Sequence, residues 1–193
     1  MKIDLFSTPI TVNELNEQVL ISTRRALEEY LKDINYTTFD STTKTTYQLD
    51  NIFSRPEYNK LKKSVLIYVN DYITSNKIDI DISNCELDGW VNISNKFDYQ
   101  EYHNHSNPKN ILSGNIFINS DEKQKYGRLV FYNPFSNLIR YSRLNCNNSS
   151  FTEKYFIKPE IGKVVIFPSW LNHSVEHNDS EVTRITISFN IKL

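Results

Sequence analysis

The sequence is poor in several residue types, and these shortages narrow the functions it can have. Its 193 residues include one alanine, one methionine, four glycines and two cysteines. The cysteines, Cys85 and Cys146, have neither metal-binding nor disulfide-framework spacing, which predicts reduced thiols in a cytoplasmic protein. No run approaches the roughly 18 apolar residues of a membrane span, and the N-terminal segment lacks the apolar core of a secretory signal. We therefore expect no association with membranes.

The charges are balanced, with 22 basic and 23 acidic side chains and a net charge of −1. Because no basic tract concentrates positive charge, nucleic-acid binding by bulk electrostatics is not expected. Hydrophobic residues make up 39% of the chain and aromatic residues 13%, which is too much for a disordered protein. A chain of this length buries roughly 70% of its unfolded surface without needing disulfides. These features predict one folded domain over residues 1–193.

The first part of the chain, to about residue 75, has helical periodicity. Apolar residues recur at three- and four-residue steps from Thr11 to about Lys32, and Thr11 with Glu14 fits a capping box. A second helix is expected from Pro56 to about Thr74, because proline suits a first helical turn. Its apolar stripe is Leu61, Val65, Val69 and Tyr72. We expect these helices to support the remainder of the fold and to offer a surface for a homodimer.

After Ser75 the hydrophobic period becomes two, which is typical of β-strands. Ile78, Ile80 and Ile82 alternate with polar residues and predict a half-buried strand. Further short strands are predicted, separated by turn-forming residues, at 89–94, 111–118, 128–132, 137–142, 154–158, 163–167, 173–177 and 183–191. Helices followed by many short strands predict a mainly β fold, a sandwich or jelly roll over about residues 76–193, with the helices packed on one sheet.

Histidine is scarce and concentrated. The four histidines, His103, His105, His173 and His177, form two pairs about 70 residues apart. Because residues i and i+2 of an extended segment point the same way, His103 and His105 share a face, and Glu101 joins them if the strand begins early. His173 and His177 are expected to share a face in the same manner. Imidazoles converging from neighbouring strands commonly form transition-metal sites, although spacing alone does not separate zinc from iron.

The last predicted strand has an unusual polar face, which carries Arg184, Thr186, Ser188 and Asn190. If this face points into a sandwich, an arginine accompanied by hydroxyl groups suits a carboxylate, which the guanidinium can hold through two hydrogen bonds. If it points to solvent instead, Arg184 is an ordinary surface residue.

Three segments, in this order along the chain, resemble motifs of the 2-oxoglutarate/Fe(II)-dependent oxygenases. The first is His103-Asn-His105-Ser-Asn-Pro followed by Ile111-Leu-Ser-Gly-Asn-Ile-Phe-Ile118. The second and third are Phe167-Pro-Ser-Trp-Leu-Asn-His173-Ser-Val and Arg184-Ile-Thr-Ile-Ser-Phe-Asn190. The resemblance is to a prolyl-hydroxylase-related group common in marine bacteria and phages, and it covers about half of the chain.

This resemblance implies a double-stranded β-helix, a cupin-like jelly roll, with Fe(II) held at one open end. By position, His103 and His173 match the two histidine ligands, and Arg184 matches the residue that pairs with the far carboxylate of 2-oxoglutarate. Ser188 or Thr186 would add a hydroxyl group to that carboxylate. The implied enzyme consumes 2-oxoglutarate and O2, releases succinate and hydroxylates a small-molecule or peptide substrate.

One position departs from the family pattern, because His105 stands where most relatives carry a carboxylate. Three ligand sets remain open. His103, His105 and His173 bind the metal together, or Glu101 or water completes a two-histidine site, or His105 is the first ligand with Asn107 at the second motif position. A three-histidine site also resembles thiol dioxygenases, which do not use 2-oxoglutarate. A cupin-type dioxygenase and a non-catalytic jelly-roll module are therefore the alternative functions.

A second departure is Phe117, near a place where prolyl-hydroxylase relatives have a tyrosine that helps to hold 2-oxoglutarate. Ser113 and Asn115 share a face with Phe117, and we expect them to supply a polar contact instead. Trp90 is expected in the core, and His177 at the surface.

Overall fold

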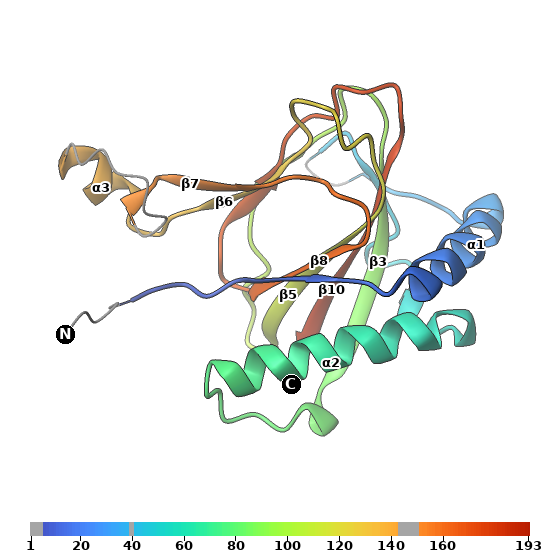
Figure 1. Ribbon diagram of the computed structural model, residues 1–193, viewed down its shortest axis with the longest axis horizontal. Helices are drawn as coiled ribbons and strands as arrows, with labels where there is room; N and C mark the ends of the chain where they lie inside the picture. Colours follow the sequence, from blue (N-terminus) through green and yellow to red (C-terminus); the bar gives the residue numbers. More distant parts are fainter. Residues whose placement is uncertain (1–5, 39–40, 143–150) are drawn as a thin grey trace.

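The computed structural model describes residues 6–38, 41–142 and 151–193, and its centre consists of two antiparallel β-sheets (Figure 1). The larger sheet has the order β1-β8-β5-β10-β3-β2, and the smaller has the order β4-β9-β6-β7. The strands of the larger sheet are β1 (Thr11–Glu14), β2 (Lys44–Thr45), β3 (Glu86–Ser94), β5 (Asn110–Asn119), β8 (Lys163–Pro168) and β10 (Arg184–Lys192). Those of the smaller sheet are β4 (Gln100–His103), β6 (Leu129–Tyr132), β7 (Lys154–Ile157) and β9 (His173–Val175). This arrangement confirms the predicted mainly β jelly roll.

Two long helices, α1 (Glu17–Asp33) and α2 (Asn59–Ser75), cover the outer face of the larger sheet, as the sequence predicts. A shorter helix, α3 (Ser136–Ser142), joins β6 to β7 and extends away from both sheets (Figure 1). Three-residue 3-10 helices occur at Ile52–Ser54 (η1), Pro56–Tyr58 (η2) and Ile82–Asn84 (η3). None of the helices in the described part of the chain has the length and hydrophobicity needed to cross a bilayer.

The first helix begins later than its apolar pattern predicts, so the Thr11–Glu14 capping box is wrong. Thr11 pairs with Ile166 as part of β1, because this segment adds a strand to the edge of the larger sheet. The helix cap is Asn16, whose side-chain oxygen accepts a hydrogen bond from the backbone N–H of Gln18 at 2.9 Å. A capping motif therefore marks a helix start only where no sheet edge competes for the same backbone groups.

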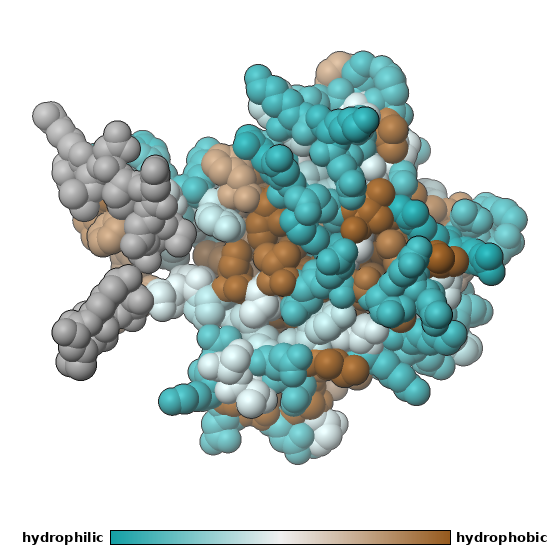
Figure 2. All heavy atoms as spheres, in the orientation of Figure 1, coloured by the Kyte–Doolittle hydropathy of each residue, from teal (hydrophilic) through white to brown (hydrophobic). Residues whose placement is uncertain are grey.

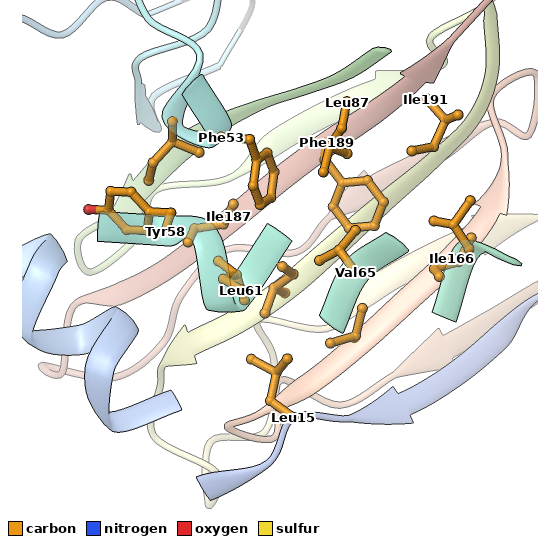
Figure 3. Close-up of a cluster of buried hydrophobic side chains, with 14 of the residues drawn as sticks. Leu15, Phe53, Tyr58, Leu61, Val65, Leu87, Ile166, Ile187, Phe189 and Ile191 are labelled. Carbon is orange, nitrogen blue, oxygen red and sulfur yellow. The ribbon is translucent and has the colours of Figure 1, made fainter. Parts of the chain in front are cut away.

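The second helix matches its prediction, with the 3-10 turn η2 leading into α2. All four residues of its predicted stripe are buried, namely Leu61, Val65, Val69 and Tyr72. Figure 3 shows Leu61 and Val65 between the helix and side chains from the strands, among them Phe189 of β10 and Ile166 of β8. Burial of this stripe against the sheet is the main hydrophobic contribution of α2 to stability.

Two predicted strands are absent from the described structure. Residues 78–82 keep the alternation of half-buried isoleucines and exposed aspartates, but they pair with no strand and end in η3. Residues 137–142 lie in α3. Just before this helix, the side-chain oxygen of Asn133 accepts a hydrogen bond from the backbone N–H of Phe135 and turns the chain. Alternation alone therefore does not make a strand, because a strand also needs a neighbouring strand with which to pair. The other seven predicted strands are confirmed, and β4 contains the extended segment expected at Glu101 and His103. The short edge strands β1 and β2 were not predicted.

The sheets enclose a second apolar cluster, which includes Phe117, Leu129, Phe131 and Phe167. Figure 2 shows hydrophobic side chains gathered in the area that β6 and β8 enclose in the same view. Of the two cysteines, Cys85 is a partly buried free thiol, and Cys146 lies outside the described residues.

The two faces of β10 separate apolar from polar side chains as predicted. Ile187, Phe189 and Ile191 are fully buried against the helices. The polar face lies between the sheets, where Arg184 is 2% exposed and Asn190 is 1% exposed. The alternative of a solvent-facing arginine is therefore wrong.

Gly114 of β5 lies opposite Phe189, and a Cβ atom on this glycine would be 2.1 Å from the phenylalanine ring. We expect Gly114→Ala to lower the free energy of unfolding by about 1–3 kcal/mol, because the ring must leave its packed position. Urea unfolding measures this cost. In a Phe189→Leu background the same substitution should cost less than half as much. Equal costs in the two backgrounds would contradict the steric explanation.

Candidate functional site

Three of the four histidines converge at one end of the smaller sheet. His103 ends β4 and pairs with His173, the first residue of β9. His105 follows two residues after β4 and is held by its backbone N–H, which donates to the carbonyl oxygen of Ser169 at 2.9 Å. The ligand nitrogen atoms of the three rings lie within 4.8 Å of one another. A cluster of three imidazoles at this spacing is typical of a transition-metal site.

The rings of His103 and His173 are oriented by backbone carbonyl groups. His103 Nδ1 lies 2.6 Å from the carbonyl oxygen of Glu101, and His173 Nδ1 lies 2.9 Å from that of Leu171. Because a carbonyl oxygen only accepts, each Nδ1 must donate and therefore carries the proton. The Nε2 lone pair of each ring is then available to a metal.

The third ring, that of His105, is held by side chains of the larger sheet. Its Nδ1 lies 2.8 Å from Asn190 Oδ1 and 3.0 Å from Ser113 Oγ. The Ser113 hydroxyl donates to the same Asn190 oxygen at 2.7 Å, so this oxygen also accepts from the imidazole N–H. Ser113 and Asn190 therefore orient His105 from behind. Ser113, which the sequence suggested as a contact for 2-oxoglutarate, is fully buried in this network.

Burial keeps the three imidazoles neutral. Desolvation, followed by the neighbouring ring of His103, lowers the pKa of His105 to about 4. Burial also lowers the pKa of His103, and it lowers the pKa of His173 well below its usual value. Neutral imidazoles keep the lone pairs that metal binding requires.

The other candidate ligands are placed differently. The Glu101 carboxylate is not part of the cluster that the described residues form. The Asn107 side-chain oxygen is engaged in a turn, where it accepts from the backbone N–H groups of Lys109 and Asn110 at 2.9 Å. His177 lies beyond the end of β9 at Val175 and is not part of the histidine cluster. Its ring is half-buried rather than at the surface, and lies 4.8 Å from that of Tyr126.

A cavity of about 430 Å³ opens beside the three histidines. Trp90, expected in the core, is buried and also lines this cavity, with its ring 5.7 Å from that of His105. Asn115 and Ser188 line the cavity from the larger sheet, as the sequence suggested. Tyr47 and Tyr102 also line it and were not predicted, because they lie in segments without hydrophobic periodicity.

Arg184 is buried and is not among the residues that line the cavity. Its guanidinium donates to the carbonyl oxygens of Gly127 at 2.9 Å and Glu176 at 3.3 Å, and to Ser94 Oγ at 3.0 Å. Burial lowers its pKa to about 10, which still leaves the guanidinium charged at neutral pH. Thr186 lies between Arg184 and Ser188 on the same face of β10, and is also buried.

The lowered pKa of His105 predicts how the stability of the metal-free protein depends on pH. Between pH 6.5 and 4 the unfolded chain binds a proton at this residue and the folded protein does not, so stability falls as the pH falls. We expect a loss of about 3 kcal/mol from His105 by pH 4, measured by urea unfolding. His105→Gln should reduce the loss of unfolding free energy between pH 6.5 and 4, and should leave its dependence on pH between pH 7 and 8 unchanged. An equally steep decline in the variant would contradict this account.

Several solved structures have a similar fold. A prolyl-4-hydroxylase of Pseudomonas putida is 8% identical, with a TM-score of 0.70 over 98% of this chain and 95% of that chain. A prolyl hydroxylase of Trichoplax adhaerens, in complex with a hypoxia inducible factor peptide, is 12% identical, with a TM-score of 0.68 over 97% and 85%. HygX of Streptomyces hygroscopicus, with nickel, 2-oxoglutarate and hygromycin B bound, is 12% identical, with a TM-score of 0.63 over 96% and 83%. At these identities the similarity concerns the fold.

No curated protein matches the sequence. The model of the family described as "Putative 2OG-Fe(II) oxygenase" matches residues 88–190. This range is more than half of the 193 residues and contains the three clustered histidines and Arg184. The chain therefore belongs to the 2OG-Fe(II) oxygenase family, whose enzymes use Fe(II), 2-oxoglutarate and O2.

Proposed function

We propose that this oxygenase is a hydroxylase whose Fe(II) is held by His103, His105 and His173. The observation that carries this proposal is that all three rings donate from Nδ1 to oxygen partners, and so offer Nε2 to a common point. Imidazole nitrogen suits iron, and the hydrogen bonds behind the rings are those that orient metal ligands. The residues present therefore fit a three-histidine iron site without a carboxylate.

The three neutral ligands leave the full double charge of Fe(II) to attract the dianion 2-oxoglutarate. When bound, the iron and 2-oxoglutarate supply the oxidising chemistry, in which O2 is consumed and succinate and CO2 are released. The buried side chains of Leu129, Phe167 and Val175 line the cavity and exclude water from the reacting centre.

The far carboxylate of 2-oxoglutarate is proposed to be held from the larger sheet. Arg184 supplies a buried positive charge, and Thr186 and Ser188 follow it on the same face of β10. Asn115 lies opposite Ser188 across the β5–β10 pairing and lines the same cavity. Ser113 has a different role in this proposal, because its hydroxyl group supports His105.

The substrate is proposed to be a small molecule or a peptide that enters past β4 and the loop after it, since residues 100–107 all line the cavity. The neighbours HygX, solved with hygromycin B, and the Trichoplax prolyl hydroxylase, solved with a peptide, agree with both classes. We also propose that the chain works as one domain, because α1 and α2 share their core with the larger sheet.

The ligand set is tested by anaerobic titration with Fe(II). We expect the wild type to bind one ion per chain, and His103→Ala, His105→Ala and His173→Ala each to weaken binding by at least about 100-fold. Asn190→Ala should weaken it by roughly tenfold, because His105 loses its orienting partner. His177→Ala is the matched control and should bind as the wild type does. Wild-type affinity in His105→Ala would show instead a two-histidine site.

The cosubstrate is tested by calorimetry of the iron-loaded protein under anaerobic conditions. Binding of 2-oxoglutarate should require the metal and should be lost in Arg184→Ala, because Arg184 is the one buried arginine among the described residues. Arg25→Ala, on the exposed side of α1, is the control, and thermal unfolding checks that each variant is folded. Iron binding without affinity for 2-oxoglutarate would favour a cupin-type dioxygenase. No metal binding would favour a jelly-roll binding module.

A further inference from the structure

The wall of the cavity carries very little charge. The described residues that line it include no lysine or arginine. Besides the three histidines and the tyrosines, Glu101 is the one ionisable side chain among them. Its carboxylate is exposed, and its one side-chain contact within the described chain is a long hydrogen bond of 3.5 Å from the hydroxyl group of Tyr99. Glu176, by contrast, is paired with Arg128 at 2.7 Å. Within the described part of the chain, the cavity therefore presents one carboxylate that forms no ion pair.

The backbone of Glu101 is fixed relative to the histidine cluster. Its carbonyl oxygen accepts the hydrogen bond from His103 Nδ1 at 2.6 Å, and the two residues belong to the same strand, β4. The backbone of Glu101 is therefore held close to the histidine cluster, and its exposed side chain extends from there. A group bound to it would position the rest of a substrate near the metal site.

Aromatic rings line the cavity together with this carboxylate. Tyr102 is 57% exposed, and its ring is steadied by an edge-on contact with Tyr132 at 4.8 Å. On the larger sheet, the Trp90 ring packs against Tyr47 at 4.6 Å. Aromatic faces attract ammonium and guanidinium groups, with an energy of about 0.5–1 kcal/mol at exposed sites.

The charge of the loaded site favours the same class of ligand. In the proposed function, on which this inference rests, Fe(II) with three neutral imidazoles carries a charge of +2, which the 2-oxoglutarate dianion cancels. A carboxylate or phosphate on the substrate would then lose its hydration without finding a cation on the cavity wall. A cationic group would find Glu101.

We propose that the primary substrate carries a cationic group, an ammonium or a guanidinium, and that Glu101 binds this group beside the aromatic rings of the cavity. Glu101 is then a specificity-determining residue rather than a metal ligand. The oxidised C–H bond lies on the part of the substrate that extends from the cation toward the histidine cluster.

The test uses the wild-type protein loaded anaerobically with Fe(II) and 2-oxoglutarate, and three probes of one length: butylammonium, butanol and butyrate. Broadening of the methyl resonance of each probe by the paramagnetic iron reports binding near the metal. We expect butylammonium to bind about fivefold more tightly than butanol, and butyrate to bind most weakly. Glu101→Gln should remove the preference for butylammonium. Glu28→Gln, the same change at an exposed position on α1, should retain it.

Equal binding of the three probes, tightest binding of butyrate, or no binding of butylammonium would overturn the proposal. A preference for butylammonium that persists in Glu101→Gln would also overturn it. Loss of iron from Glu101→Gln would also overturn the proposal, because it would show that Glu101 is a metal ligand. Iron and 2-oxoglutarate binding are measured on the same samples. If the wild type binds neither iron nor 2-oxoglutarate, the proposed function is wrong, and the proposed substrate class, which rests on it, is wrong as well.

Discussion

The alternation of side chains along β10 is the constraint on which both the core and the candidate site depend. Ile187, Phe189 and Ile191 attach one face of the strand to the helices, while its other face places Arg184 and Asn190 between the sheets. A shift of one residue in register would exchange these faces. The hydrophobic packing of α2 therefore also determines where the polar groups lie. Pairing with β3 on one side and β5 on the other leaves the strand little freedom to shift.

The orientation of His105 shows how the larger sheet completes a site that is otherwise built on the smaller one. His103 and His173 are held by carbonyl oxygens of their own chain segments, two residues earlier in each case. His105 lies beyond the end of β4 and has no such local partner, so its Nδ1 depends on Asn190 and Ser113 of the larger sheet. An amide oxygen accepts a hydrogen bond from the imidazole N–H without adding a charge to the site. Burial keeps the cluster neutral, although the hydrogen bond to Asn190 by itself raises the pKa of His105.

Much of this arrangement could be predicted from the sequence because it is encoded in local alternation. The two faces of β10 and the shared side of His103 and His105 follow from a period of two. The same period misassigns residues 78–82, because alternation does not reveal whether a neighbouring strand edge exists. Residues 137–142, also predicted as a strand, form a helix. The Thr11–Glu14 capping pattern fails for the related reason that β8 offers such an edge. Tyr47 and Tyr102 reach the cavity through long-range strand pairing, which leaves no local signal.

The charged side chains described around the cavity are unevenly distributed, so the electrostatic potential differs from one end of the cavity to the other. Arg184 is buried among carbonyl oxygens, whereas Glu101 is exposed on β4 and lines the cavity. The histidine cluster is near one end of β10, at Asn190, and Arg184 is at the other. A dianion that entered first would be drawn past the metal toward the arginine and away from the glutamate. A later ligand would then meet a neutralised metal and an acidic entrance. In the proposed function, the charges that orient the cosubstrate would also select against a second anion, so the cavity would discriminate between its two ligands without a separate binding domain.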